Sequence, residues 1–83
     1  MPDRPPRALV TGGSGAIGAA ICRRLASDGL DVIVHSNKNL PTAQAVADAI
    51  VAEGGRAQAV AFDITDATAT HAALQALLAA GPI

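Results

Sequence analysis

Three short apolar runs along this chain of 83 residues are each followed by a longer stretch with helical periodicity. The runs cover residues 7–11, 31–35 and 56–62, and their Val, Ile, Leu and Ala side chains stop at glycines or polar residues. Continuous apolar runs of this length are typical of strands that are buried on both faces. The pattern therefore predicts the order strand, helix, strand, helix, strand, helix.

The first predicted helix follows a glycine-rich turn. Ile17, Ile21 and Leu25 mark one apolar face at positions i, i+4 and i+8, with Arg23 toward the solvated side. The helix is expected to end at Gly29, because glycine adopts the left-handed backbone conformation that often follows a helix.

The second and third predicted helices have their own start and stop signals. The second is expected to begin at Pro41 and to stop at Gly54. The third runs from about Ala67 to Ala80, behind an N-cap at Thr65 or Asp66. The positions of these two helices that we expect to face inward are Ala43, Val46, Ala47, Ile50, Val51, Leu74, Leu77 and Leu78.

Strands that alternate with helices of this length form a parallel sheet with right-handed crossovers. The fold expected is α/β, with the strand order 3-2-1 of one half of a doubly wound, Rossmann-type sheet. We expect residues 7–83 to be the N-terminal β-α-β-α-β-α half of a dinucleotide-binding domain, behind a flexible, proline-rich arm at residues 1–6. The first strand would then lie at an uncovered edge, where a fourth strand normally follows.

The composition excludes several classes of function. Hydrophobic residues make up 51% of the chain and aromatic residues 1%, so the core must consist of small aliphatic side chains. A net charge of −1 lacks the basic surface of a nucleic-acid-binding protein, and no apolar run reaches the ~18 residues of a membrane span. The chain begins without the apolar segment of a signal peptide, and its one cysteine, Cys22, is expected to be a packing residue. These features favour a cytoplasmic protein.

The turn between the first strand and the first helix, Thr11-Gly-Gly-Ser-Gly-Ala-Ile-Gly18, carries the most specific chemistry. Gly12 allows a sharp turn, Gly15 lets the backbone approach a pyrophosphate, and Gly18 lets the helix pack tightly on the strand. The N–H groups at the helix start face the phosphates, aided by the helix dipole, and Ser14 adds a hydroxyl donor. A strand before and a helix after favour a nucleotide site over a turn without a ligand. No Gly-Lys-Ser/Thr follows, so the turn is not an ATP-type P-loop.

The end of the second strand bears on the identity of the nucleotide. NAD sites carry an acidic residue about 20 residues beyond the glycines, where it accepts hydrogen bonds from the ribose hydroxyls. Here the polar loop expected from residue 36 onward contains Ser36, Asn37 and Lys38 and no acid, and these side chains suit a 2′-phosphate. NADP(H) is therefore expected rather than NAD(H), with an ordinary solvated lysine as the alternative for Lys38. His35 is expected to pack at the strand end and His71 to lie exposed on the third helix, neither as a catalytic group.

Asp63 at the end of the third strand would face the adenine side of the crevice in this topology. Its carboxylate could accept a hydrogen bond from the adenine amino group. The alternative role is capping of the third helix, which Thr65 or Asp66 could already provide. We favour the adenine role.

These segments resemble the short-chain dehydrogenase/reductase family, and within it most of all the 3-oxoacyl-(acyl-carrier-protein) reductases. The resemblance extends over nearly the whole chain after Pro6. It is carried by four segments, Arg7 to Gly18, Asp31 to Val34, Glu53 to Arg56 and Ala61 to Asp66.

The resemblance implies roles for individual residues. The family's cofactor-binding turn is matched by Gly12, Ser14, Ile17 and Gly18. Asp63 and Ile64 match its adenine-contacting pair, and Ser36 stands where NAD-dependent members carry Asp. The family's Asn-Ala-Gly segment and its Ser and Tyr-x-x-x-Lys follow the fourth strand. We therefore expect no catalytic residue and no metal ligand within these 83 residues, and no turnover by them alone.

For the parent protein, the resemblance implies NADPH-dependent reduction of a 3-oxoacyl thioester on acyl carrier protein, as in fatty-acid biosynthesis, by a homo-tetramer. The turn departs from the family's usual Thr-Gly-x-x-x-Gly-x-Gly, because Ala16 stands at the second glycine. Its spacing through Gly12, Gly15 and Gly18 is similar to that of the extended members, such as nucleotide-sugar epimerases and dehydratases. Such an enzyme, or a non-catalytic dinucleotide-binding module, is the alternative function.

Overall fold

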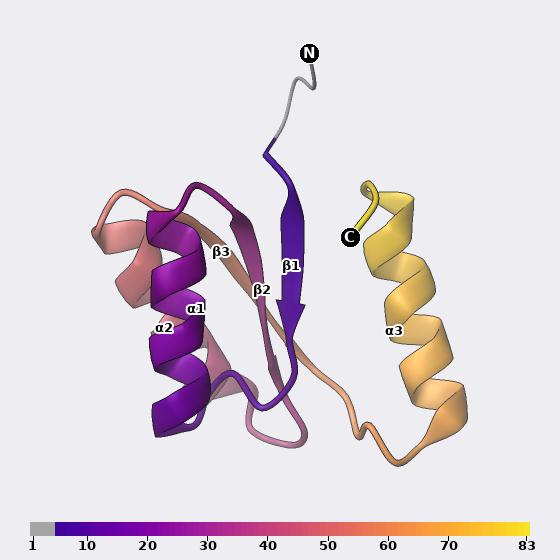
Figure 1. Cartoon of the computed structure of the whole chain (residues 1–83). Coiled ribbons are helices and arrows are strands. Elements are labelled where there is room, and N and C mark those ends of the chain that lie inside the picture. The colour runs from indigo at the N-terminus through magenta and orange to yellow at the C-terminus, as the bar shows by residue number, and fades with distance from the viewer. Residues whose placement is uncertain (1–4) are drawn as a thin grey trace.

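The computed structural model describes residues 5–83, so residues 1–4 of the predicted arm lie outside the described residues. The elements of the described part are β1 (Arg7–Val10), α1 (Ala16–Ser27), β2 (Asp31–Ser36), α2 (Leu40–Ala52), β3 (Arg56–Ala61) and α3 (Ala67–Ala79). β2 pairs in parallel with β1 on one side and with β3 on the other (Figure 1). The predicted element order and the strand order 3-2-1 of a Rossmann-type half are confirmed, and most element bounds differ from the prediction by one residue.

Helices α2 and α3 each begin directly after a residue whose side chain caps the helix. The Asn39 side chain accepts a hydrogen bond from the Thr42 N–H at 3.1 Å, with Pro41 in the first turn of α2. At α3, the Asp66 side chain accepts from the Ala69 N–H at 3.0 Å. Of the two caps predicted for α3, Asp66 is therefore the one used.

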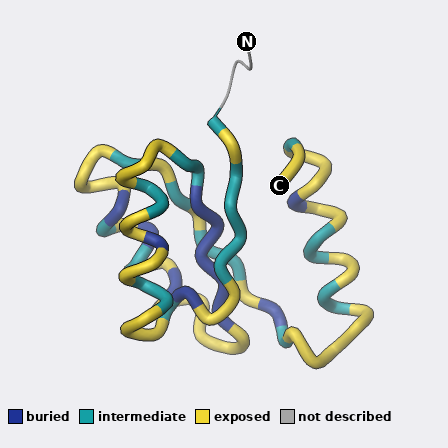
Figure 2. Tube along the Cα trace, viewed as in Figure 1, coloured by how far each residue is buried: buried dark blue, intermediate teal, exposed yellow. Residues whose placement is uncertain are grey.

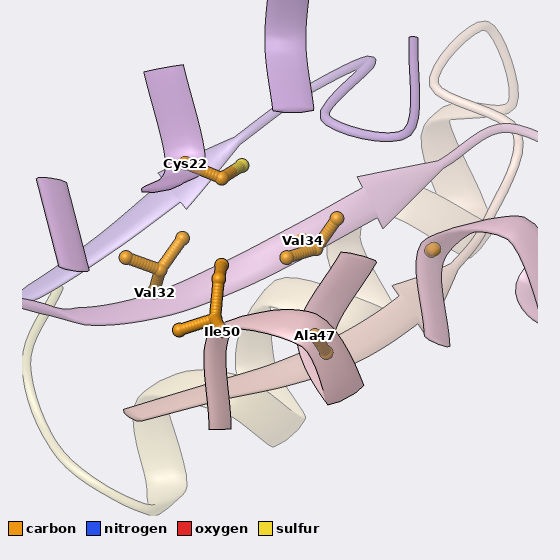
Figure 3. Packing of buried hydrophobic residues seen from close by; sticks show 6 residues of the cluster. Cys22, Val32, Val34, Ala47 and Ile50 are labelled. Atoms are coloured by element: carbon orange, nitrogen blue, oxygen red, sulfur yellow. The ribbon is translucent and has the colours of Figure 1, made fainter. Parts of the chain in front are cut away.

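The core lies between the sheet and the two helices α1 and α2, which Figure 1 shows on the same side of the sheet. β2 is the most deeply buried strand, which Figure 2 shows as a continuous buried segment. Six buried side chains pack together in this layer (Figure 3): Cys22, Val32, Val34, Ala43, Ala47 and Ile50. Because successive residues of a strand face opposite sides, Ile33 and His35 point to the other face of the sheet.

Four of the apolar side chains that the sequence placed on inward or apolar helix faces are exposed. Three of them are Ile21, Val51 and Leu78, which are 47%, 54% and 53% exposed. For these three, the residue beside each in the sequence is buried instead: Cys22, Ile50 and Leu77. Neighbours in a helix are turned by about 100°, so only one of each pair can meet the sheet. Ile17 shares the face of Ile21 and is 80% exposed, while the predicted packing role of Cys22 is confirmed.

α3 stands on the opposite side of the sheet from α1 and α2, beyond β1, which is an edge of the described sheet (Figure 1). One side chain links it to that strand. The Nη1 atom of Arg7 donates hydrogen bonds to the carbonyl oxygens of Leu77 and Gly81, each at 2.8 Å. A guanidinium at the C-terminal end of a helix also complements the negative end of the helix dipole.

None of the helices within residues 5–83 has the length and apolar character that crossing a bilayer requires.

Candidate functional site

The carboxyl ends of three parallel strands meet at one edge of the sheet, and all the predicted site residues lie in or beside the loops that follow them. The first loop is the glycine turn after β1, the second joins β2 to α2, and the third joins β3 to α3. Figure 1 shows the three loops together below the sheet. Crevices at the carboxyl ends of the strands are where open α/β sheets bind ligands.

The glycine turn has a backbone that two of its glycines make possible. Gly12 has φ of 67°, a left-handed conformation that glycine adopts without strain. A Cβ on Gly18 would strike the carbonyl oxygen of Gly12 and lie 2.8 Å from the Cα of Gly13. Gly18 therefore packs on the turn itself, which corrects the expectation that it packs on the strand. The start of α1 folds back over the turn that precedes it.

Gly15 differs from the other two, because the protein itself does not require a glycine there. Its φ of −75° and ψ of 169° suit any residue, and an added Cβ would lie 3.7 Å from the nearest atom, the Gly12 carbonyl oxygen. Gly15 caps α1 without a side-chain hydrogen bond, so the N–H groups of the first helical turn remain accessible. Half-buried Ser14 and exposed Ile17 flank this position. The missing side chain leaves room for a phosphate to reach the helix start, and the turn fits a pyrophosphate.

Ser36 is the last residue of β2, which corrects the expectation that it begins the loop. It pairs with Ala61 of β3 and is 7% exposed. Its Oγ accepts a hydrogen bond from the Asn39 N–H at 3.1 Å. The hydroxyl keeps its own hydrogen as a donor.

Asn37 ties the second loop to the third. Its Oδ1 accepts a hydrogen bond from the Ile64 N–H at 3.1 Å. Both residues are exposed, as is Lys38 beside them. The bond uses the carbonyl oxygen of Asn37, so its NH₂ group is the part that could donate to a ligand.

Asp63 presents a carboxylate beside these residues. Its Oδ1 accepts hydrogen bonds from the Thr65 hydroxyl at 2.6 Å and the Thr65 N–H at 2.9 Å. These bonds, and to a smaller extent the positive charge of Lys38, hold the pKa of Asp63 below its ordinary value. The carboxylate is therefore ionised at neutral pH. Since Asp66 caps α3, the capping alternative for Asp63 is not the role it takes.

Thr65→Val is expected to raise the pKa of Asp63 toward its ordinary value, because the hydroxyl donor is lost while the N–H donor remains. A lowered pKa stabilises the folded state above the ordinary carboxyl range, and this contribution is lost as the pH falls through the folded value. When the pH is lowered, the free energy of unfolding of the variant should therefore fall less than that of the native protein. Carboxyl ¹³C NMR titration measures the pKa directly. Thr68→Val on α3 is the control, and an unchanged pKa in Thr65→Val contradicts the assignment.

His35 has a larger role than the packing expected for it. The residue is 2% exposed, and its ring lies tilted on Phe62 with ring centroids 4.3 Å apart. The Gly12 N–H donates to Nδ1 at 3.2 Å, and Nε2 lies 2.8 Å from the carbonyl oxygen of Phe62. The Gly13 N–H also donates to the His35 carbonyl oxygen, at 2.9 Å. A polar residue within an apolar strand signals buried hydrogen bonds, but the sequence does not name the partners.

The remaining nucleophile and metal-ligating groups form no second site in residues 5–83. Burial raises the pKa of the Cys22 thiol, so this cysteine stays protonated and packs in the core. No group of three His, Cys, Asp or Glu side chains gathers as a metal site in this part of the chain.

The sheet topology and the phosphate-compatible turn define a mononucleotide-binding half of a Rossmann-type domain. The model of the short chain dehydrogenase family matches residues 6–81, and this chain belongs to that family. The resemblance that the sequence carries is thereby confirmed.

Two individual relatives are likewise an oxidoreductase and a reductase by name. The chain is 44% identical over 69 residues to an uncharacterised oxidoreductase of Methylorubrum extorquens, a match that covers 83% of this chain and 28% of that protein. It is 42% identical over 57 residues to the 3-oxoacyl-(acyl-carrier-protein) reductase FabG of Aggregatibacter actinomycetemcomitans, covering 69% of this chain and 24% of the reductase. The chain thus spans about a quarter of the length of these relatives.

Two solved structures are similar to the fold. A 3-oxoacyl (acyl-carrier-protein) reductase from Agrobacterium tumefaciens C58 with NADP bound has a TM-score of 0.84 at 41% identity, covering 96% of this chain and 31% of that one. A metagenomic short-chain oxidoreductase in complex with NADP has a TM-score of 0.86 at 40% identity, covering 90% and 34%.

Proposed function

We propose that these residues form the adenosine- and pyrophosphate-binding half of an NADP(H) site. The whole protein is then a cytoplasmic oxidoreductase that reduces a 3-oxoacyl thioester on acyl carrier protein to the 3-hydroxyacyl form, and it works as a homo-tetramer. The observation that carries the cofactor proposal is the turn at Gly15, where neither backbone conformation nor packing requires a glycine. A pyrophosphate that approaches the backbone explains why a side chain is missing there.

Each loop has one task in this proposal. The first-turn N–H groups of α1 and the Ser14 hydroxyl hold the pyrophosphate. Ser36 and Asn37 donate to the 2′-phosphate, and Lys38 adds a positive charge. Asp63 accepts from the adenine amino group, with Ile64 beside it. When bound, the cofactor supplies the hydride for the reduction.

The relatives support the choice of cofactor and substrate class. Two solved relatives at about 40% identity hold NADP, and one of them is a 3-oxoacyl (acyl-carrier-protein) reductase by name. FabG of Aggregatibacter actinomycetemcomitans carries the same name. The absence of an acid from residues 36–38 agrees with a cofactor that bears a 2′-phosphate.

Ser36→Asp is expected to reverse the preference for NADP⁺ over NAD⁺. The new carboxylate repels a 2′-phosphate and accepts hydrogen bonds from ribose hydroxyls, while it can still accept from the Asn39 N–H. The ratio of the Kd for NADP⁺ to the Kd for NAD⁺ should rise at least about tenfold, or ~1.4 kcal/mol. Isothermal titration calorimetry measures both constants. Ser27→Asp at the exposed end of α1 is the control.

Two outcomes contradict the assignment of the cofactor. One is an unchanged ratio in Ser36→Asp, and the other is a native protein that prefers NAD⁺. The substrate class is tested separately, with the protein as its gene encodes it, by following NADPH oxidation with acetoacetyl thioesters. Turnover of nucleotide sugars instead would favour the extended members of the family.

A further inference from the structure

We propose that His35 is a positioning residue for the cofactor turn, which it holds in shape while its ring is neutral and releases when its ring is protonated. This inference rests on the proposed function, because it concerns the turn that receives the pyrophosphate. It assigns a proton-dependent role to a residue that would not itself touch the cofactor.

The side chain of His35 connects the first and third loops of the site, and its backbone lies in the strand that leads into the second. It belongs to β2, immediately before Ser36, its Nδ1 accepts from Gly12 in the first loop, and its Nε2 bonds the carbonyl oxygen of Phe62, immediately before Asp63. The Gly13 N–H bonds the His35 carbonyl oxygen as well, at 2.9 Å. The position of Gly12 and Gly13 relative to the other two loops is therefore set through one residue.

The two ring contacts specify one protonation state. Because the Gly12 N–H is a donor, Nδ1 must accept, and the hydrogen of the neutral ring lies on Nε2, from which it is donated to the carbonyl oxygen of Phe62. Protonation places a hydrogen on Nδ1, so two donors face each other across 3.2 Å. At 2% exposure, water cannot easily replace the lost bond. Gly12 then has to move, and the glycine turn changes its conformation with it.

The charged groups on the same face of the sheet are remote from the ring. Arg7 on β1, Asp31 on β2 and Arg56 on β3 form one row across the sheet. This row is four residues before His35, or about 13 Å at the usual rise of a strand.

The other charged groups are occupied elsewhere or lie across the sheet. Asp63 follows Phe62 but binds Thr65, and Lys38 is exposed beside it. On α3, Asp66 caps the helix and His71 is exposed. The charged groups of α1, α2 and their ends, together with Cys22, belong to the layer on the opposite face: Arg23, Arg24, Asp28, Asp48 and Glu53.

The consequence is a proton linkage with a definite sign. Cofactor binding requires the ordered turn, so it favours the neutral ring, and the ring takes up protons more readily in the free protein. Affinity for the cofactor is therefore full while the ring is neutral and falls when a lower pH places a proton on Nδ1. For one linked proton the loss is at most about tenfold in Kd per pH unit.

The first measurement concerns the protein without cofactor. Imidazole ¹⁵N NMR at pH 8 should give His35 a protonated Nε2 and an unprotonated Nδ1. The protection factor of the Gly12 amide, which corrects its exchange rate for the intrinsic slowing at lower pH, should fall as the pH of the sample falls toward 5.5, and His71→Asn should show the same fall. A proton on Nδ1 at pH 8 overturns the proposal.

The second measurement separates positioning from packing. In His35→Asn, the amide oxygen can take the place of Nδ1 as acceptor, but it does not titrate. This variant keeps the bond from Gly12 but loses the bond to the Phe62 carbonyl oxygen, so its Kd for NADP⁺ at pH 8 should lie between that of the native protein and that of His35→Leu. Because the 2′-phosphate of NADP⁺ also titrates near pH 6, the quantity compared is the ratio of the native Kd to the variant Kd at each pH. That ratio should rise as the pH falls from 8 to 5.5.

The controls keep the proposal distinct from the proposed function. His71→Asn should follow the native protein at every pH, and His35→Leu, which removes both ring bonds, should bind weakly throughout if thermal melting shows it folded. A flat ratio for His35→Asn overturns the proton linkage. Failure of the native protein to bind NADP⁺ at any pH contradicts the proposed function instead, and the NMR experiment without cofactor still decides the role of His35.

Discussion

Gly18→Ala is expected to destabilise the protein by about 3 kcal/mol and to abolish NADP⁺ binding, because its new methyl group meets backbone that cannot move aside. The Cβ would strike the Gly12 carbonyl oxygen and lie 2.8 Å from the Gly13 Cα and 3.0 Å from the Gly12 carbonyl carbon. Relief of these contacts requires the start of α1 to move away from the turn. Urea unfolding followed by far-UV circular dichroism measures the loss of stability.

Gly15→Ala is the matched control, three residues earlier in the same segment. Its Cβ would lie at ordinary contact distance, 3.7 Å from the Gly12 carbonyl oxygen. Alanine is a poorer N-cap than glycine, so the free energy of unfolding should fall by no more than about 1 kcal/mol. NADP⁺ binding should nevertheless weaken, because the methyl group occupies the approach to the helix start. Equal stability of the two variants would show that the tight contact at Gly18 does not support the fold.

Ile50→Ala should lower the free energy of unfolding by about 3 kcal/mol, within the range of measured large-to-small substitutions in cores. Ile50 is 2% exposed and belongs to the cluster between α2 and the sheet. Its Cγ2 also covers Gly55, where a Cβ would lie only 2.8 Å away, so the cavity would open at the start of β3. Thermal and urea unfolding give the difference from the native protein.

Val51→Ala provides the comparison for Ile50→Ala, since it removes methyl groups from the next residue of the same helix. Val51 is 54% exposed, and the substitution should change the free energy of unfolding by less than about 0.5 kcal/mol. Losses of similar size for both residues would mean that α2 does not turn Ile50 toward the sheet and Val51 toward solvent.

The order of elements could be predicted because it depends on local patterns. Runs of aliphatic residues, the cap at Asp66 and the turn at Gly12 each act within a few residues of sequence. The sequence predicted less well which face of each helix is buried. Val51 and Leu78 are as apolar as their buried neighbours, and only the position of the sheet decides which residue of each pair is covered.

The residues of the candidate site also fall into two groups, those whose role depends on local sequence and those whose role depends on the folded sheet. The turn at Gly12 could be predicted because it acts within one turn of the chain, whereas Gly18 was expected to pack on the strand and packs on the turn instead. The environment of Ser36 could not be predicted, because pairing with β3 extends β2 by that residue. Nor could the bonds of His35, which join segments 23 and 27 residues away in the sequence. Hydrogen bonds of that kind exist only once the sheet has formed.

The link between Arg7 and α3 bears on the order in which the chain assembles. The residues that it joins are 70 and 74 positions apart, so the contact closes a long loop of the polypeptide. Closing so long a loop is entropically costly until the intervening chain is already compact. A ribosome also delivers Arg7 well before Leu77 and Gly81. The sheet and its two covering helices can therefore collapse during synthesis, whereas α3 docks only after the last turn of the helix has emerged.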